Sequence, residues 1–295
     1  MRKLLMVVNP RAGKSKSHGP LYDAAAAFSE GGYLLSIHNT TAPGDAREWI
    51  VRHGREFDIV VAAGGDGTLN EAVSALMELD APPLLGYLPQ GSTNDFAASL
   101  HIPPEADAAA ASILKGETRR LDIGRWNGRC FVYVASFGAF TRTSYSASQN
   151  AKNALGHFAY LLEGARNLDT LRPYQVRLTA DGENLDGEYL FGAVCNSTSI
   201  GGMMKLETER VVLDDGLFEL LLIPNPRNPA DVQNLMMALV NQEYDHLIFR
   251  HVSSVRLETE EDLPWSLDGE YAPSAPVVEI ENRRQALAML LPRET

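Results

Sequence analysis

Short apolar runs alternate with amphipathic segments over the first 120 residues of the chain. The apolar runs predict strands, mostly buried on both faces, at Lys3–Val8, Leu34–His38, Asp58–Ala63 and Leu84–Leu88. The segments between and after them predict helices at Pro20–Glu30, Asp45–His53, Thr68–Leu79 and Glu105–Leu114. Because strands and helices alternate with short connections, we expect an α/β domain, residues 1–121, with a parallel sheet covered by helices on both faces.

After residue 120 the pattern changes to strand-like runs separated by turns. The runs Leu121–Trp126 and Cys130–Ala135 flank Asn127-Gly128, a dipeptide typical of a type I′ hairpin. Further strands are predicted at Tyr174–Thr179, Tyr189–Cys195, Leu217–Ile223, His251–Glu258 and Val277–Ile280, and helices at Ala151–Leu168 and Pro229–Val240. This predicts a mostly antiparallel β domain, residues 122–283. The last run fits either domain, so residues 284–295 are candidates to complete the first.

Composition narrows the class of protein. Of 295 residues, 45% are apolar and 22% charged, as in soluble globular proteins. We expect neither a membrane span nor a leader, because no apolar run approaches ~20 residues and no signal pattern opens the sequence. The two cysteines exclude a disulfide framework and favour a cytoplasmic location. The net charge of −12 makes nucleic acid a poor partner, although residues 1–20 carry five basic residues and no acid.

The strongest local signal is the motif Gly64-Gly65-Asp66-Gly67-Thr68-Leu69-Asn70-Glu71, directly after a predicted buried strand. Its glycines let the backbone approach a ligand closely, and the helix N-terminus that follows favours an anion. Thr68 and Glu71 have the spacing of a capping box. A carboxylate beside phosphate is repulsive unless a cation or hydroxyl intervenes. Asp66 therefore indicates phosphate with Mg²⁺, or an acceptor for a hydroxyl proton; a tight turn without a ligand is the structural alternative.

Two more loops follow strands of the same predicted sheet. Asn9-Pro10-Arg11-Ala12-Gly13-Lys14-Ser15 offers small residues, hydroxyls and positive charge, as a phosphate cradle needs, without Walker A spacing. Pro89-Gln90-Gly91-Ser92-Thr93-Asn94-Asp95-Phe96 is rich in glycine, hydroxyl and amide groups. We expect the three loops to converge, because the carboxyl ends of parallel strands form one edge of a sheet.

In this order and spacing, NPRAG, GGDGTLNE and GSTNDF resemble the diacylglycerol kinase catalytic domain family, which includes bacterial lipid kinases and sphingosine and ceramide kinases. The resemblance runs nearly end to end. It implies a nucleotide-binding α/β domain followed by a β-sandwich lipid-substrate domain, with the active site in the cleft between them. It also implies ATP as phosphoryl donor, Mg²⁺ as cofactor and a lipid alcohol as substrate.

The resemblance assigns nucleotide contacts residue by residue. Thr40 matches the threonine of a T-x-x-x-G-D-A motif, and Ser92 stands where the family usually has threonine. Asp66 would belong to the nucleotide–magnesium network. The complete set of implied nucleotide contacts is Asn9, Arg11, Gly13, Thr40, Gly64, Gly65, Asp66, Gly67, Thr68, Leu69, Asn70 and Ser92.

Two acidic turns lie in the second half. Leu213-Asp214-Asp215-Gly216-Leu217 reads locally as a hairpin turn; the resemblance implies a Mg²⁺ site formed by the Asp215 carboxylate and the carbonyls of Val212 and Leu217. Leu267-Asp268-Gly269-Glu270 also reads as a type I′ turn, and resembles the catalytic L-D-G-E motif. Glu270 is the predicted proton acceptor, with Asp268 as its partner or as the alternative base.

A lipid kinase without a membrane span has to dock transiently, and we expect this at the inner face of the membrane. Candidate docking residues are Lys14, Lys16, Arg142, Tyr145, Lys152 and Arg166, with 137–153 as a hypothetical acyl-chain gate. Diacylglycerol is the expected substrate. Another lipid alcohol, a soluble-substrate kinase of NAD-kinase type and a non-catalytic lipid- or nucleotide-binding protein remain alternatives, and a homodimer is left open.

Overall fold

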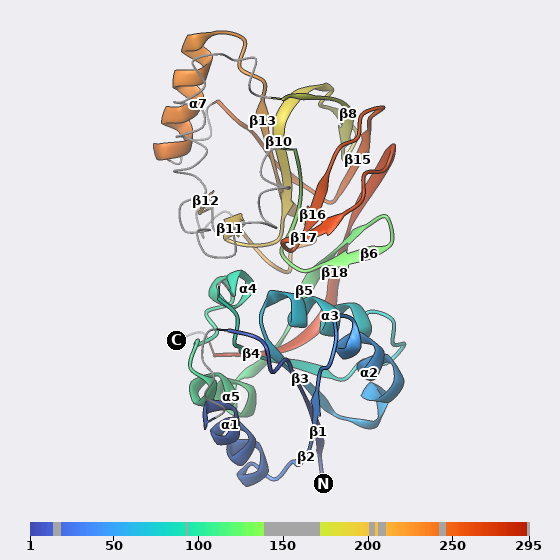
Figure 1. Ribbon diagram of the computed structural model, residues 1–295, viewed down its shortest axis with the longest axis vertical. Coiled ribbons are helices and arrows are strands. Elements are labelled where there is room, and N and C mark those ends of the chain that lie inside the picture. Colours follow the sequence, from blue (N-terminus) through green and yellow to red (C-terminus); the bar gives the residue numbers. More distant parts are fainter. Residues whose placement is uncertain are drawn as a thin grey trace. The chain divides into compact units, whose positions relative to one another are not determined.

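The computed structural model describes residues 1–13, 19–92, 94–138, 172–200, 204–205, 211–241 and 246–293 (Figure 1). The chain divides into two units. Unit 1 comprises Met1–Ile123 and Gln285–Thr295, and unit 2 comprises Gly124–Arg284. Two strands, β5 (Glu117–Trp126) and β18 (Val277–Leu291), contribute residues to both units.

Unit 1 is built on parallel strands. These are β1 (Lys3–Val8), β2 (Leu34–Asn39), β3 (Ile59–Gly64) and β4 (Leu84–Pro89). Their order is β18-β4-β3-β1-β2, and β4 pairs in parallel with the end of β18 through Leu85 and Met289. All six residues of β3 are buried, as its unbroken apolar sequence predicts. The last apolar run of the chain thus extends the sheet of unit 1.

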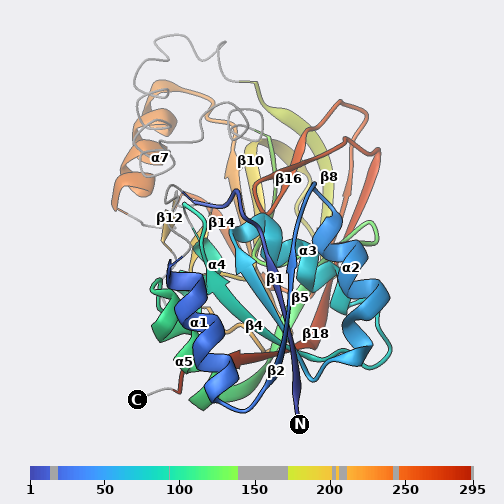
Figure 2. The ribbon, with the colours of Figure 1, turned by 60° about the horizontal axis from the view of Figure 1, so that its bottom comes forward.

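Helices cover both faces of this sheet. α1 (Gly19–Glu30) packs with α5 (Ala106–Lys115), and α2 (Asp45–His53) packs with α3 (Asp66–Leu76). Figure 2 shows these two helix pairs on opposite sides of the strands. Two short helices, η1 (Gly54–Glu56) and α4 (Asp95–Ser99), complete unit 1. The predicted α/β architecture is confirmed.

Unit 2 is an antiparallel sandwich in its described pairings. One sheet contains β16 (Trp265–Leu267), β17 (Glu270–Ala272), β7 (Val134–Gly138), β10 (Gly187–Cys195), β13 (Phe218–Pro224) and β14 (Ile248–Val252). The other joins β8 (Tyr174–Ala180), β9 (Glu183–Asn184), β15 (Ser254–Glu258) and β18. A short pair, β11 (Ser199–Ile200) and β12 (Met204–Lys205), and the helix α7 (Pro229–Asn241) accompany them. The predicted mostly antiparallel domain is confirmed.

Aromatic side chains dominate the sandwich core. The Trp265 ring lies 5.1 Å from Phe137 and 5.8 Å from Trp126, centroid to centroid, and Phe131 lies 5.6 Å from Phe218. All five side chains are buried. Large aromatic residues bury much apolar area per residue, and the tilted contacts between their rings stabilise the core further.

The predicted hairpin is present, but its second strand is shorter than predicted. Asn127 (φ +43°) and Gly128 (φ +87°) have the positive φ values of a type I′ turn. The strand predicted at Cys130–Ala135 is instead split into β6 (Arg129–Phe131) and β7. The strand predicted at His251–Glu258 is likewise split at Ser253, and its halves, β14 and β15, join different sheets.

No helix in the described parts of the chain is long and apolar enough to cross a membrane. The helix predicted at Ala151–Leu168 lies outside the described residues, as does most of the proposed gate at 137–153.

Candidate functional site

The three Gly-rich loops of unit 1 contact one another at the carboxyl edge of the sheet. Asn9 Nδ2 donates to Thr68 Oγ1 at 3.3 Å, joining the loop after β1 to the loop after β3. The backbone N–H of Gln90, after β4, donates to the Gly64 carbonyl at 2.7 Å. The convergence predicted from the sequence is therefore present.

Two close approaches require glycine in these loops. Gly13 has φ +75°, and a Cβ built there would lie 2.4 Å from the Gln90 carbonyl oxygen. A Cβ on Gly91 would lie 2.7 Å from the Gly65 Cα. Any larger residue would push the loops apart, because both obstacles are backbone atoms. The glycines thus serve contacts between loops, which is a structural role beside any ligand contact.

Glu71 has a different role from the predicted one. Helix α3 begins at Asp66, with Gly65 as its N-cap and no side-chain cap, so the capping box expected for Thr68 and Glu71 is absent. Instead, the Glu71 carboxylate accepts the backbone N–H groups of Gly44 at 2.8 Å and Ala46 at 3.1 Å. Through these hydrogen bonds Glu71 connects the Gly-rich motif to a fourth loop, which carries Thr40.

One oxygen of the Asp66 carboxyl group has no hydrogen-bond partner among the described residues. This atom, Oδ1, is buried, although the residue as a whole is half-buried. Burial, and next the neighbouring Asp95 carboxylate, raise the pKa of Asp66 to about 6, against the lowering effect of backbone N–H groups of residues 94–96. Burial also raises the pKa of Asp95 to about 6. A bound cation would favour the ionised form of both carboxyl groups and lower their pKa values again.

Asp95 lies in the third Gly-rich loop motif, but the sequence alone did not indicate a role for it. Its neighbour Asn94 shapes the loop: Oδ1 accepts the Gly91 N–H at 2.8 Å and the Tyr87 hydroxyl at 3.3 Å, while Nδ2 donates to the Gly91 carbonyl at 3.0 Å. Asn94 has φ +51°, a conformation that asparagine tolerates better than most residues. The glycine and amide residues around Asp95 indicated a shaped loop. They did not indicate that Asp95 approaches Asp66, because that approach depends on the tertiary fold.

The other predicted nucleotide contacts are accessible to different degrees. Asn9, Thr40, Gly67 and Asn70 are half-buried, Arg11 and Ser92 are exposed, and Leu69 is buried. Leu69 therefore can contribute only its backbone to a ligand. Thr93 and the first-loop residues Lys14 and Lys16 lie outside the described residues, as do Arg142, Tyr145, Lys152 and Arg166.

In unit 2, Asp268 is occupied by the protein itself. Its Oδ2 accepts the Val132 N–H at 2.7 Å, and its Oδ1 accepts the N–H groups of Tyr133 at 2.9 Å and Val134 at 3.0 Å. The side chain is 5% exposed, and the backbone has φ +50° at the start of an Asp-Gly turn. Asp268 thus caps the point where the predicted strand breaks between β6 and β7.

Glu270 lies two residues further on and is exposed at the start of β17. It pairs in register with Leu267 on β16. Of the two acidic residues in the turn, Glu270 is the one whose carboxylate is accessible to a substrate.

The Asp215 turn precedes β13. Asp215 is exposed and its Oδ1 accepts the Leu217 N–H at 2.9 Å, while Gly216 has φ +91°. Burial, with a further contribution from the Asp215 carboxylate, raises the pKa of Glu219 to about 8. Glu219 Oε2 is buried, and no described residue forms a hydrogen bond with it. Among the described residues, no three His, Cys, Asp or Glu side chains gather as a metal site. A cation at this turn would therefore rely on backbone carbonyls and water beside Asp215.

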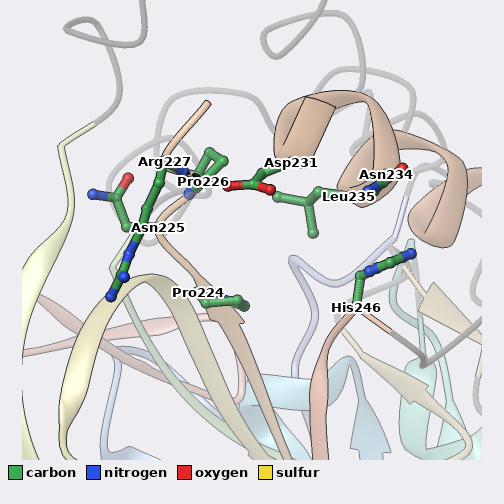
Figure 3. A pocket seen from close by; sticks show the side chains of 8 residues that line it. All are labelled: Pro224, Asn225, Pro226, Arg227, Asp231, Asn234, Leu235 and His246. Carbon is green, nitrogen blue, oxygen red and sulfur yellow. Dashed lines mark hydrogen bonds between the residues drawn. The ribbon is translucent and has the colours of Figure 1, made fainter. Parts of the chain in front are cut away.

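A pocket of about 220 Å³ also lies in unit 2, at the junction of β13, α7 and His246 (Figure 3). Its lining residues are Pro224, Asn225, Pro226, Arg227, Asp231, Asn234, Leu235 and His246. Asp231 is already engaged, accepting the Arg227 N–H at 2.9 Å and an Asn228 Nδ2 hydrogen at 3.0 Å. None of the predicted site residues lines this pocket.

Comparison with known proteins covers both units. Residues 3–126 match the family model described as diacylglycerol kinase catalytic domain, and residues 134–291 match the YegS C-terminal NAD kinase beta sandwich-like domain. A protein of Bacillus subtilis (strain 168) named diacylglycerol kinase is 35% identical, covering 100% of this chain and 98% of its own. A Staphylococcus aureus (strain MRSA252) protein of the same name is 33% identical, with coverages of 94% and 89%. A crystal structure from Bacillus anthracis (strain Sterne) superposes with a TM-score of 0.82 at 24% identity, with coverages of 98% and 97%.

Proposed function

Because the chain belongs to the diacylglycerol kinase family of lipid kinases, we propose that it transfers the γ-phosphate of ATP, with Mg²⁺, to the hydroxyl of diacylglycerol and so produces phosphatidic acid. The names of the relatives support the lipid substrate. The ATP and Mg²⁺ dependence is supported by the chemistry of the residues in unit 1.

The observation that carries the proposal is the carboxyl pair of Asp66 and Asp95 among the Gly-rich loops. Asp66 has a buried oxygen that no described residue satisfies, and both groups have a pKa of about 6. Hard carboxylate oxygens suit Mg²⁺, which when bound would neutralise phosphate charge. The loops around them supply the small residues and backbone N–H groups that receive phosphates. We assign the nucleotide to Asn9, Arg11, Gly13, Thr40, Gly64–Asn70 and Ser92.

Unit 2 would supply the acceptor side of the reaction. We assign Glu270 as the base that orients the lipid hydroxyl and takes its proton, because its carboxylate is exposed. Asp268 would act as a positioning residue, since its two oxygens hold three backbone N–H groups next to the turn. Asp215, with the carbonyls of Val212 and Leu217, would hold a second Mg²⁺.

The substrate hydroxyl of diacylglycerol lies at a membrane surface, so the proposal includes a transient, peripheral membrane contact on the cytoplasmic side. Each Lys or Arg near an anionic surface contributes about 1 kcal/mol. The net charge of −12 requires that such a contact be local.

The test is transfer of labelled phosphate from ATP to a panel of lipid alcohols in mixed micelles, with a Mg²⁺ titration. We expect diacylglycerol to be the preferred acceptor. Glu270→Gln should lower kcat by about 10²–10⁴-fold, the usual contribution of a positioned base, with ATP affinity retained. Glu260→Gln, another exposed glutamate of unit 2, serves as the matched control and should remain active.

Two results would contradict the proposal. Nearly full activity of Glu270→Gln on a soluble alcohol would favour a kinase of NAD-kinase type. ATP binding without transfer to any acceptor would favour a non-catalytic binding protein.

A further inference from the structure

The loop that carries Thr40 belongs to the edge strand of unit 1. β2 is the last strand in the sheet order, and among the described strands it pairs only with β1. The loops after β1, β3 and β4 have neighbouring loops to hold them, whereas the loop after an edge strand has a neighbour on one side only. Its conformation must therefore depend on side chains from outside the sheet.

The Asp45 carboxylate supplies this support from within the loop. Its Oδ2 accepts the Thr41 N–H at 2.7 Å and the Thr41 hydroxyl at 2.9 Å, which fixes the Thr40–Thr41 backbone. Hydrogen bonds from Thr41, followed by that from His38, lower the pKa of Asp45 below its ordinary value. Asp45 is thus ionised at neutral pH and accepts charge-assisted hydrogen bonds.

His38 and Trp49 in turn hold Asp45. His38 Nε2 donates to Asp45 Oδ1 at 3.0 Å, and both side chains are about four-fifths buried. The Trp49 ring stacks on the His38 ring, with centroids 4.0 Å apart and planes 6° apart. Trp49 projects from α2, one turn after Asp45, so strand and helix meet in this contact.

His53 offers an internal comparison. It lies one turn after Trp49 on α2, and the two ring centroids are 4.5 Å apart, but its Nδ1 pairs with Glu56 at 3.0 Å. Both histidines therefore contact the Trp49 indole. In the described contacts, only His38 also forms a hydrogen bond to Asp45, the residue that holds the Thr40 loop.

We propose that His38 and Trp49 are positioning residues for ATP: they hold Asp45, and through it the Thr40 loop, in the geometry that receives the nucleotide. The inference rests on the proposed function, since it takes Thr40 as a nucleotide contact. Glu71 fastens the same loop to the Gly-rich motif through Gly44 and Ala46. The loop is thus held at both ends by carboxylates, and His38 and Trp49 orient one of them.

A consequence is that Trp49 reports on the nucleotide. Indole emission responds to neighbouring imidazole and to local ordering. The other two tryptophans, Trp126 and Trp265, are buried in the sandwich core of unit 2. Tightening of the Thr40 loop by a nucleotide should therefore change the emission of Trp49 selectively.

The experiment compares His38→Phe with the matched control His53→Phe in the full-length chain. Phenylalanine keeps the stack on Trp49 and removes the hydrogen bond to Asp45. We expect His38→Phe to weaken ATP binding in the presence of Mg²⁺, and to raise the KM for ATP, by about tenfold, as for one lost charge-assisted hydrogen bond, with kcat within about twofold. His38→Gln, which can still donate to Asp45, should recover part of the affinity. His53→Phe should leave both constants within about twofold.

Fluorescence gives a second readout. Addition of ATP and Mg²⁺ to the unaltered protein should change the tryptophan emission, and Trp49→Phe should abolish that change. Unchanged ATP affinity in His38→Phe, or an equal loss in His53→Phe, would overturn the inference while leaving the lipid kinase proposal intact. Absence of ATP binding in the unaltered protein would overturn both.

Discussion

Two aspartates in signature motifs, one in each unit, differ in how their oxygens are satisfied. Asp268 of unit 2 is 5% exposed, and its two oxygens accept three backbone N–H groups. Asp66 of unit 1 has a buried oxygen with no hydrogen-bond partner in the described part of the chain, and its pKa is raised to about 6. A carboxylate that is fully hydrogen-bonded stabilises the fold, whereas one left unsatisfied beside another acid is suited to bind a cation. The difference separates a structural aspartate from a candidate ligand without reference to their motifs.

The structural role of Asp268 has a parallel within the same unit. Asp181, in the turn Asp181-Gly182, also has positive φ (+45°), and it accepts the N–H groups of Ser253 at 2.7 Å and Ser254 at 2.8 Å. That contact lies where β14 ends and β15 begins. In both cases an Asp-Gly turn provides a carboxylate that satisfies the backbone of a neighbouring strand at its break.

Among the changes that test this difference between Asp66 and Asp268, Asp66→Asn has the largest expected effect. We expect kcat/KM with Mg²⁺ and ATP to fall by about 10²–10³-fold, because the negative charge that would hold the cation beside the phosphates is lost. The ligand-free protein should instead become more stable at pH 7, by about 1–2 kcal/mol after allowance for solvent screening, since the ionised Asp66 is disfavoured in the folded state. Urea unfolding and steady-state kinetics measure the two effects. A lower free energy of unfolding in Asp66→Asn than in the unaltered protein would contradict the inference that Asp66, unlike Asp268, does not stabilise the fold.

Asp268→Ala should have the opposite profile. Removing this carboxylate leaves three buried N–H groups without their acceptor, and each such group costs about 1–3 kcal/mol. We expect the free energy of unfolding to fall by about 3 kcal/mol or more, measured by urea titration. Asp181→Ala is the matched control; its turn is exposed, so water can replace the lost acceptor and the cost should be about 1 kcal/mol. Equal costs for the two variants would show that burial is not what distinguishes them.

The sequence correctly predicted those strands and turns whose conformation depends only on neighbouring residues in the chain. The buried strands of unit 1 and the Asn127-Gly128 turn are examples, because apolar continuity and turn chemistry are local properties. The strand breaks at Val132 and Ser253 were missed, since the carboxylates that compensate them come from Asp268 and Asp181, 136 and 72 residues away in the chain. The role of Glu71 was misjudged for the same reason: a capping-box spacing was present, but a loop 25 residues upstream competes for the carboxylate.

In the candidate site, too, features set by local sequence were predicted, and features that depend on distant residues were not. Convergence of the Gly-rich loops followed from strand order, because parallel strands end at one edge. The importance of Asp95 did not follow, since its effect on Asp66 depends on the packing of α4 against the loop after β3. The distinction between Asp268 and Glu270 also required the fold, because both are acidic residues of one turn and only their contacts separate them.

The smallest expected effect is a pH dependence that Asp95→Asn should reduce. The pKa values of Asp66 and Asp95, about 6 in the folded protein, lie above the 3.8 of unperturbed carboxyls. As pH rises from about 4 to 6, the unfolded chain therefore loses these protons first, and the stability that the two groups contribute below pH 4 is lost.

Asp95→Asn removes one group and lowers the pKa of Asp66 by removing its charged neighbour. The decrease in the free energy of unfolding between pH 4 and 7 should thus be smaller by about 1–2 kcal/mol in this variant, after allowance for solvent screening, measured by urea unfolding without ligand. Asp80→Asn, which alters a fully exposed carboxylate of the same unit, should reproduce the slope of the unaltered protein. Equal slopes for all three proteins would mean that the pKa of Asp95 is not raised in the folded protein and that Asp95 does not affect Asp66. The distinction between Asp66 and Asp268 would then depend on the Asp66 oxygen that no described residue satisfies.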